Sequence, residues 1–160
     1  MEKNVIMGVK VEKIIYIYIM SFQGNETAIL DGNGRVPFPL SFRKLVPNER
    51  EFYISPGVDN CLHLRRVCDY EVWRLKLDQL EQTRENYINR RKLLSNTERV
   101  VLDDKQNRFL LPKKLKEWAG IDKDVVFSGN GDFVVISNVE KAAPYALNEA
   151  DDFKGMEWIL

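Results

Sequence analysis

The stretch "LDGNGRVPFPLSFRK", residues 30–44, places three turn-forming residues between Asp31 and Arg35 and follows them with two prolines in an apolar run. Glycine adopts positive φ freely, and asparagine tolerates it best among the other residues, so Gly32, Asn33 and Gly34 predict a tight turn between two strands. Asp31 and Arg35 flank that turn and can meet across it as a carboxylate–guanidinium pair. The stretch therefore predicts a hairpin with a charged tip.

The pattern recurs 73 residues later, in "DDKQNRFLLPKKLKEW", residues 103–118. A gap-free alignment places Asp31 on Asp104, Arg35 on Arg108 and Pro39 on Pro112, with Asn107 opposite Gly34. The same register brings "FYISPGVDN" (52–60) onto "VVFSGNGDF" (125–133). A register kept across both stretches is hard to obtain by chance, and it predicts one module present twice.

Each module is expected to contain four strands and one short helix. Proline ends the second strand because it lacks the ladder donor, and Gly120 is well placed to cap the second helix. The expected strands are 26–30, 35–38, 51–55 and 61–64, then 99–103, 108–111, 124–128 and 133–137, with helical turns at 40–45 and 113–120. Apolar residues at helical spacing after Asp69, a candidate N-cap, predict one broken helix or two between the modules.

The expected organisation is an α+β chain whose two modules form one domain, or two small domains sharing a core. Its segments are an extension (1–19), module 1 (20–67), a helical connector (68–96), module 2 (97–140) and a C-terminal segment with an acidic tail (141–160). The tail has a net charge of −3 from residue 148 onward and is expected to be a frayed, solvated end.

Composition excludes a globally basic protein. The chain has 160 residues, with 24 Lys and Arg balancing 24 Asp and Glu, so its formal net charge is zero. This balance leaves room for a local basic patch. The apolar run 14–20 is too short to cross a bilayer and has no signal-peptide cleavage pattern, so it is either an additional strand or leader sequence before a start at Met20.

Metal binding and catalysis are not expected. Cys61 and Cys68, with His63 between them, lack the close-set ligand pairs typical of zinc sites and are read as reduced thiols. His63 lies in an apolar strand and is expected to be packed. No phosphate-binding loop motif and no nucleophile with a base is found, so no cofactor or small-molecule substrate is predicted.

The repeated tip has a structural and a functional interpretation. As a structural device, an exposed Asp–Arg pair adds only about 0–1 kcal/mol. Keeping both residues in two diverged copies favours a carboxylate that orients a guanidinium toward an outside anion, because the planar fork of arginine suits phosphate or the guanine edge. Nearby side chains are also positively charged, as binding to an anion requires. The candidate DNA-binding set is Asp31, Arg35, Arg43, Asp104, Arg108, Lys113, Lys114 and Lys116.

Over residues 20–145, these motifs and their matching hairpins resemble the MraZ family, bacterial regulators built from two AbrB-like modules. The resemblance implies a pseudo-two-fold double-split β-barrel in one chain, with the D-x-x-x-R positions as DNA contacts. Arg43 matches the family's basic position after the first proline, and Lys116 takes that place in module 2. Asn107 departs from the usual family glycine.

The resemblance further implies a homo-oligomeric ring, commonly an octamer, in the cytoplasm and at the nucleoid. It would bind repeated promoter boxes on double-stranded DNA and repress its own division and cell-wall gene cluster. The alternative is a ring-forming scaffold for protein partners without specific DNA readout.

Overall fold

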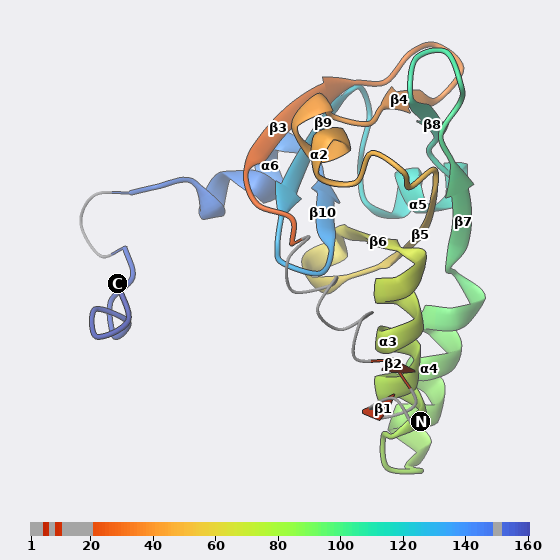
Figure 1. Ribbon diagram of the computed structural model, residues 1–160, viewed down its shortest axis with the longest axis vertical. Coiled ribbons are helices and arrows are strands. Elements are labelled where there is room, and N and C mark those ends of the chain that lie inside the picture. Colours follow the sequence, from red (N-terminus) through yellow and green to blue (C-terminus); the bar gives the residue numbers. More distant parts are fainter. Residues whose placement is uncertain (1–4, 7–8, 11–20, 149–151) are drawn as a thin grey trace.

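The structure is a computed structural model that describes residues 5–6, 9–10, 21–148 and 152–160 (Figure 1). The apolar run 14–20 and the proposed start at Met20 lie outside the described residues. A short ladder near the N-terminus pairs β1 (Val5–Ile6) with β2 (Val9–Lys10).

Two sets of equivalent elements follow each other along the chain. The first contains β3 (Asn25–Ile29), β4 (Arg35–Pro37), α2 (Leu40–Leu45), β5 (Glu51–Pro56), η1 (Val58–Asn60) and β6 (Leu62–Arg66). The second contains β7 (Glu98–Val101), β8 (Arg108–Leu110), α5 (Lys113–Trp118), β9 (Asp124–Gly129), β10 (Val134–Ser137), α6 (Val139–Ala142) and η2 (Ala143–Tyr145). Antiparallel strands with a few helices confirm the α+β class.

Proline begins both short helices, and glycine ends the second one, as the sequence predicts for Gly120. Pro39 and Pro112 occupy the N-cap positions of α2 and α5, with φ values of −58° and −56°. Gly120 has a φ of +65°, and its N–H donates to the carbonyl of Glu117 after α5 ends. The positive φ that glycine adopts without strain therefore terminates this helix.

The two modules exchange their first strands. The six-stranded antiparallel sheet has the order β3-β9-β10-β6-β5-β7, so β3 of module 1 pairs with β9 of module 2, and β7 of module 2 pairs with β5 of module 1. Strands β4 and β8 pair separately, with Val36 opposite Phe109, which are 73 residues apart. If each strand is replaced by its equivalent in the other module, the same strand order results, read from the opposite edge of the sheet.

One apolar core serves both modules. Side chains from both halves are fully buried in it, among them Val36, Phe42, Phe52, Phe109 and Phe127. Because neither half encloses these residues alone, burial of apolar area couples the two halves thermodynamically.

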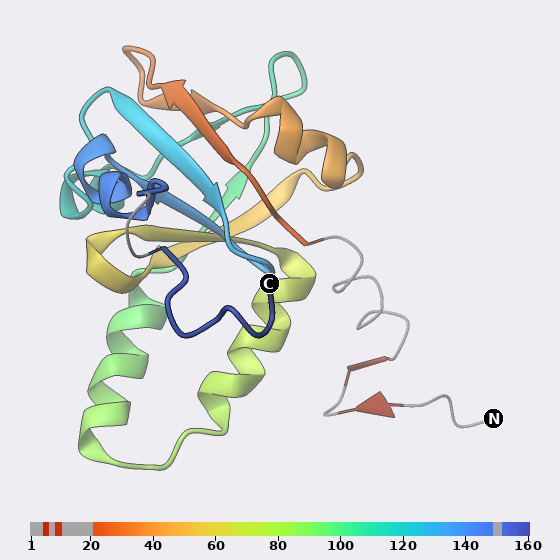
Figure 2. The ribbon, with the colours of Figure 1, turned by 90° about the vertical axis from the view of Figure 1, so that its left-hand side faces the viewer.

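The connector forms a helical hairpin of α3 (Val67–Asp78) and α4 (Arg84–Ser95), which projects from the end of the molecule opposite the β4 and β8 tips (Figures 1 and 2). Thr83 caps α4, since its Oγ1 accepts a hydrogen bond of 3.1 Å from the N–H of Asn86. The prediction that Asp69 is the N-cap of this connector helix is wrong, because the N-cap of α3 is Arg66. The helix begins after Arg66, and Asp69 lies inside it as the buried ion partner of that arginine.

The hairpin is anchored on the sheet face turned away from the core, which we call the outer face. The ring of Tyr70 stacks on Tyr53 of β5 with centroids 3.9 Å apart. The guanidinium carbon of Arg65, on β6, lies 4.5 Å from the ring centroid of Trp73. Nη1 of Arg65 also donates to Oγ of Ser55 at 3.3 Å, and the ring faces of Trp73 and Phe133 add negative potential that favours the buried cation. No helix in the described part of the chain has the length and apolar character needed to cross a membrane.

His63 also lies on the outer face, packed against Phe133 with ring centroids 4.3 Å apart, as the sequence predicts for a packed histidine. Burial, followed by the positive charge of Arg65, lowers the pKa of His63 from 6.5 to about 4. The folded protein therefore disfavours the imidazolium form.

This shift predicts a loss of stability in mild acid. Between pH 6.5 and about 4 the unfolded chain binds a proton on His63 that the folded chain does not, so stability present above pH 6.5 is lost as pH falls. The expected loss is up to about 3 kcal/mol. Urea unfolding at pH 7.0 and 4.5 measures it, and the matched variant His63→Phe should show a smaller difference between the two pH values. An equal difference in both proteins would assign the acid sensitivity to other groups.

Candidate nucleic-acid interface

The two repeated turns lie at the same end of the molecule (Figure 1) and stand apart from each other in Figure 2. We call residues 31–35 tip 1 and residues 103–108 tip 2. Each tip leads into a strand of the β4–β8 pair, and that pairing holds the tips together. The N–H of Leu111 donates to the carbonyl of Gly34, and the N–H of Phe38 donates to that of Asn107, so each turn is bonded to the other module.

The turns follow the predicted conformational logic in part. Gly34 has a φ of +79° and Asn107 a φ of +51°, so these aligned residues both occupy the left-handed region. Gly32 and Asn33 lie in the turn, as predicted, but neither adopts a positive φ. The demand for positive φ is thus confined to one position per tip, and asparagine meets it in tip 2.

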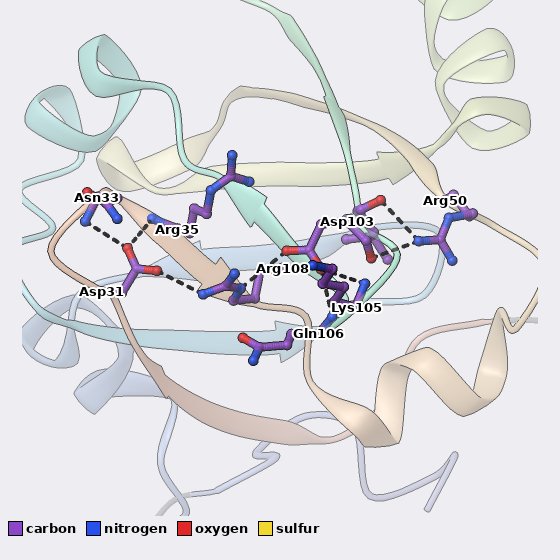
Figure 3. A network of polar contacts seen from close by, with 9 residues as sticks. Asp31, Asn33, Arg35, Arg50, Asp103, Lys105, Gln106 and Arg108 are labelled. Carbon is purple, nitrogen blue, oxygen red and sulfur yellow. Dashed lines mark hydrogen bonds and ion pairs between the residues drawn. The ribbon is translucent and has the colours of Figure 1, made fainter.

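In tip 1 the carboxylate of Asp31 organises the turn rather than pairing with the side chain of Arg35. Its Oδ1 accepts hydrogen bonds from the backbone N–H groups of Asn33, at 2.8 Å, and Arg35, at 3.0 Å (Figure 3). The N–H of Arg35, followed by that of Asn33, lowers the pKa of Asp31, so this carboxylate is ionised at neutral pH.

The counterpart of Asp31 is Asp103, not Asp104, which corrects the gap-free alignment. Oδ1 of Asp103 accepts from the N–H groups of Lys105, at 3.2 Å, and Gln106, at 2.7 Å. The N–H of Asp103 donates to the carbonyl of Arg108, and in the same way the N–H of Asp31 donates to the carbonyl of Arg35. Tip 2 is one residue longer than tip 1, so the register shifts by one on the N-terminal side of the turn.

Asp104 has a different environment. Its side chain is 96% exposed, and its carboxylate forms an ion pair of 3.0 Å with Arg50. Arg50 also donates to the backbone carbonyls of Leu102, at 3.2 Å, and Asp103, at 2.7 Å, so it fastens the base of tip 2 to the start of β5. Arg50 and Asp103 were not predicted from the sequence. Asp103 could have been considered, because two adjacent aspartates, Asp103 and Asp104, precede the turn and either could be the counterpart of Asp31.

The two arginines of the repeated motif differ. The guanidinium of Arg108 donates through Nη1 to Asp31 of tip 1 and through Nε to Asp103 of tip 2, both at 3.2 Å. Within the described part of the chain, the guanidinium of Arg35 forms no hydrogen bond or ion pair, and its side chain extends away from the carboxylates (Figure 3). The predicted Asp31–Arg35 side-chain pair is therefore replaced by a pair between modules.

The other predicted basic residues divide into two groups. Lys113 and Lys114 are exposed in the first turn of α5, and Lys116 is half-buried in the same helix. Arg43 is half-buried, and its guanidinium donates to the carbonyls of Val46, at 2.7 Å, and Glu49 after the end of α2. Arg43 thus stabilises the C-terminal end of α2 in this conformation.

Other chemistries have little support in the described residues. Cys61 and Cys68 are free thiols whose pKa values are raised by burial, which disfavours the thiolate required for metal binding or nucleophilic attack. No group of three or more metal-binding side chains gathers in the part of the chain that the structure describes.

Comparison with known proteins gives consistent relatives, although no family model matches the sequence. A protein named Transcriptional regulator MraZ from Natranaerobius thermophilus is 32% identical over 136 residues, covering 84% of this chain and 93% of the relative. Proteins of the same name from Syntrophomonas wolfei and Clostridium beijerinckii are 31% and 32% identical, covering 83% and 81% of this chain and 92% and 90% of the relatives.

Proposed function

Because the chain belongs to the MraZ family of transcriptional regulators, we propose that it binds double-stranded DNA through tips 1 and 2. The observation that carries this proposal is the arrangement of the tips. Two turns related by the internal repeat stand at one end of the molecule and are joined by the ion pair of Arg108 with Asp31, while the guanidinium of the half-buried Arg35 is directed away from the carboxylates (Figure 3). Such a group suits bidentate binding of a phosphate or of the O6 and N7 atoms of guanine.

The geometry suggests different roles within the predicted contact set. Arg35 is the primary contact, while Arg108 positions the tips by holding Asp31 and Asp103 together. Lys113 and Lys114 add exposed positive charge on α5, the helix that follows β8, and such charge is suited to phosphates. Lys116 and Arg43 lie closer to the body of the molecule, and Asp104 neutralises Arg50 at the edge of the interface.

We infer an AbrB-like double-split β-barrel for the duplicated modules. The exchange of first strands between the halves and the interleaved β4–β8 pair support it, since both features relate the modules by a pseudo-two-fold axis. Two tips related in this way match the two-fold character of a DNA duplex.

In the cell, the proposed role is repression of the protein's own division and cell-wall gene cluster, in the cytoplasm and at the nucleoid. A homo-oligomeric ring, an octamer in the implied form, would bind several promoter boxes at once. Linked tips gain from effective concentration, which compensates for the zero net charge of a single chain.

A mobility-shift experiment tests the proposal with the DNA immediately upstream of the gene. The native chain should shift a duplex that contains regularly spaced repeats, and excess duplex of scrambled sequence should not compete. The double variant Arg35→Ala/Arg108→Ala, with folding verified by circular dichroism and mass by sedimentation, should give no shift. Undiminished binding by this variant would favour the alternative, a ring-forming scaffold for protein partners without specific DNA readout.

A further inference from the structure

The outer face of the sheet is covered differently in the two modules. In module 1 the long helix α3 continues from β6 and places Tyr70 on Tyr53 and Trp73 over Arg65. Two aromatic side chains thus fill the space between helix and sheet.

In module 2 the equivalent helix ends early. Helix α6 spans only Val139–Ala142, and the 3-10 turn that follows contains Pro144. At the 73-residue offset, Tyr70 corresponds to Ala143 and Trp73 to Ala146. The short helix has no aromatic side chain at either position.

A pocket of about 490 Å³ lies on this part of the outer face. It is bordered by β3, β9, β10, β6 and the turn after α6, with His63, Ser128, Phe133, Val135, Tyr145 and Ala146 among its lining residues. Its size is in the range of sites that enclose an aromatic side chain and its neighbours.

The C-terminal segment, residues 152–160, carries apolar side chains without a covering surface in the folded chain. Phe153, Met156, Trp158, Ile159 and Leu160 are all exposed, and the exposed fraction of Trp158 is 83%. The segment lies away from the sheet in Figure 1. Apolar residues exposed at this density mark an interaction site.

We propose that residues 152–160 of one copy dock into this pocket on a second copy of the chain, with Trp158 entering where module 1 has Trp73. The inference rests on the self-association in the proposed function and does not depend on the DNA contacts. Each copy would give its segment and receive another at a different surface. Such head-to-tail contacts close into rings when the rotation between copies permits.

Local charge complementarity favours this occupant. The ammonium group of Lys141, which lines the pocket, donates to the carbonyls of Asn60, at 3.0 Å, and Ala119, at 2.8 Å, so its positive charge is held in place beside the pocket. The segment contains Asp152, Lys154 and Glu157, a side-chain net charge of −1, and the acidic Glu157 directly precedes Trp158. Entry of Trp158 would therefore bring a carboxylate near a fixed cation.

The first experiment removes the segment. Sedimentation over a range of concentrations should show that the full chain assembles, and that the chain ending at Asn148 is smaller at the same concentrations. Trp158→Ala should raise the dissociation constant of assembly by about 100-fold, as expected for loss of a buried aromatic anchor. Trp118→Ala, which removes a partly exposed tryptophan on α5, is the matched control and should assemble normally.

The second experiment tests the pocket directly. A fluorescent peptide of residues 147–160 should bind the truncated chain, and Ala146→Trp, which supplies the missing aromatic residue, should block both the peptide and assembly. Unchanged assembly after truncation, or no peptide binding, would overturn the proposal. A full chain that stays monomeric but binds the peptide only after truncation would show that the segment occupies its own pocket, which also overturns docking between copies.

The outcomes separate this inference from the DNA-binding proposal. Arg35→Ala should leave the mass of the assembly unchanged. If this variant assembles normally but no longer binds DNA, the defect lies in the tips and leaves the docking proposal intact. Conversely, Ala146→Trp should retain binding to a duplex with one promoter box and lose the added affinity for several boxes.

Discussion

Replacing Arg35 with alanine is expected to weaken binding to a duplex with several promoter boxes by about 100-fold or more. A bidentate arginine–guanine contact contributes roughly 1–3 kcal/mol, and the loss recurs at every tip 1 in a multivalent complex. Because the guanidinium of Arg35 has no hydrogen bond or ion pair among the described residues, the change should not weaken the fold. Fluorescence anisotropy with a labelled duplex, at fixed salt, measures the change.

Arg108→Ala serves as the comparison within the same interface. Its guanidinium joins Asp31 to Asp103, so its removal should loosen both tips, lower the melting temperature slightly and reduce affinity less than Arg35→Ala does. Arg99→Ala, an exposed arginine paired with Glu51 on β5, should bind DNA as the native chain does. If Arg108→Ala lost more affinity than Arg35→Ala, the assigned roles of contact and brace would be reversed.

Repeating both titrations at several salt concentrations distinguishes base from phosphate contact. Loss of a phosphate contact lowers the slope of log K against log salt by about one unit, whereas loss of a base contact leaves it nearly unchanged. A steep slope that survives in Arg35→Ala, together with lower affinity, would place Arg35 on a base edge.

Replacing Asp69 with alanine should cost about 3–5 kcal/mol of unfolding free energy, because it leaves a buried guanidinium without its carboxylate. The side chains of Arg66 and Asp69 are fully buried and share two hydrogen bonds, and Arg66 also lies over the ring of Phe22, 5.7 Å from its centroid. In a protein of this size the melting temperature should fall by about 10 °C or more.

Asp78→Ala provides the exposed control. Asp78 pairs with Arg74 at 3.3 Å and with Arg90 at 2.7 Å, but these side chains are about two-fifths exposed, so the expected cost is below about 1 kcal/mol. Chemical denaturation of both variants at neutral pH gives the comparison. Equal losses would mean that the buried pair contributes no more than a surface ion pair.

Local features of the fold could be predicted because neighbouring residues determine them. Helix α2 has the predicted bounds, Leu40–Leu45, since a proline fixes its start and apolar spacing defines its inner face. Asn107 occupies the positive φ expected opposite Gly34. In both cases the deciding interactions lie within a few residues in the sequence.

Other features depend on partners that the sequence alone does not identify. The extra residue in tip 2 makes Asp103 the counterpart of Asp31, and only the hydrogen bonds distinguish it from Asp104. The pairing of Arg108 with Asp31 joins residues 77 positions apart, and that of Arg66 with Asp69 depends on burial under Phe22. Choices of this kind are settled by packing between segments rather than by local propensity.

The exchange of first strands has a consequence for synthesis on the ribosome. Asn25 of β3 pairs with Ser128 of β9, so the first strand of the sheet waits for a partner that is translated 103 residues later. Until then the nascent N-terminal half has an open hydrogen-bonding edge, which makes it the stage most exposed to misassociation with other nascent chains. The six-stranded sheet of this regulator can therefore be completed only after β9 has been translated.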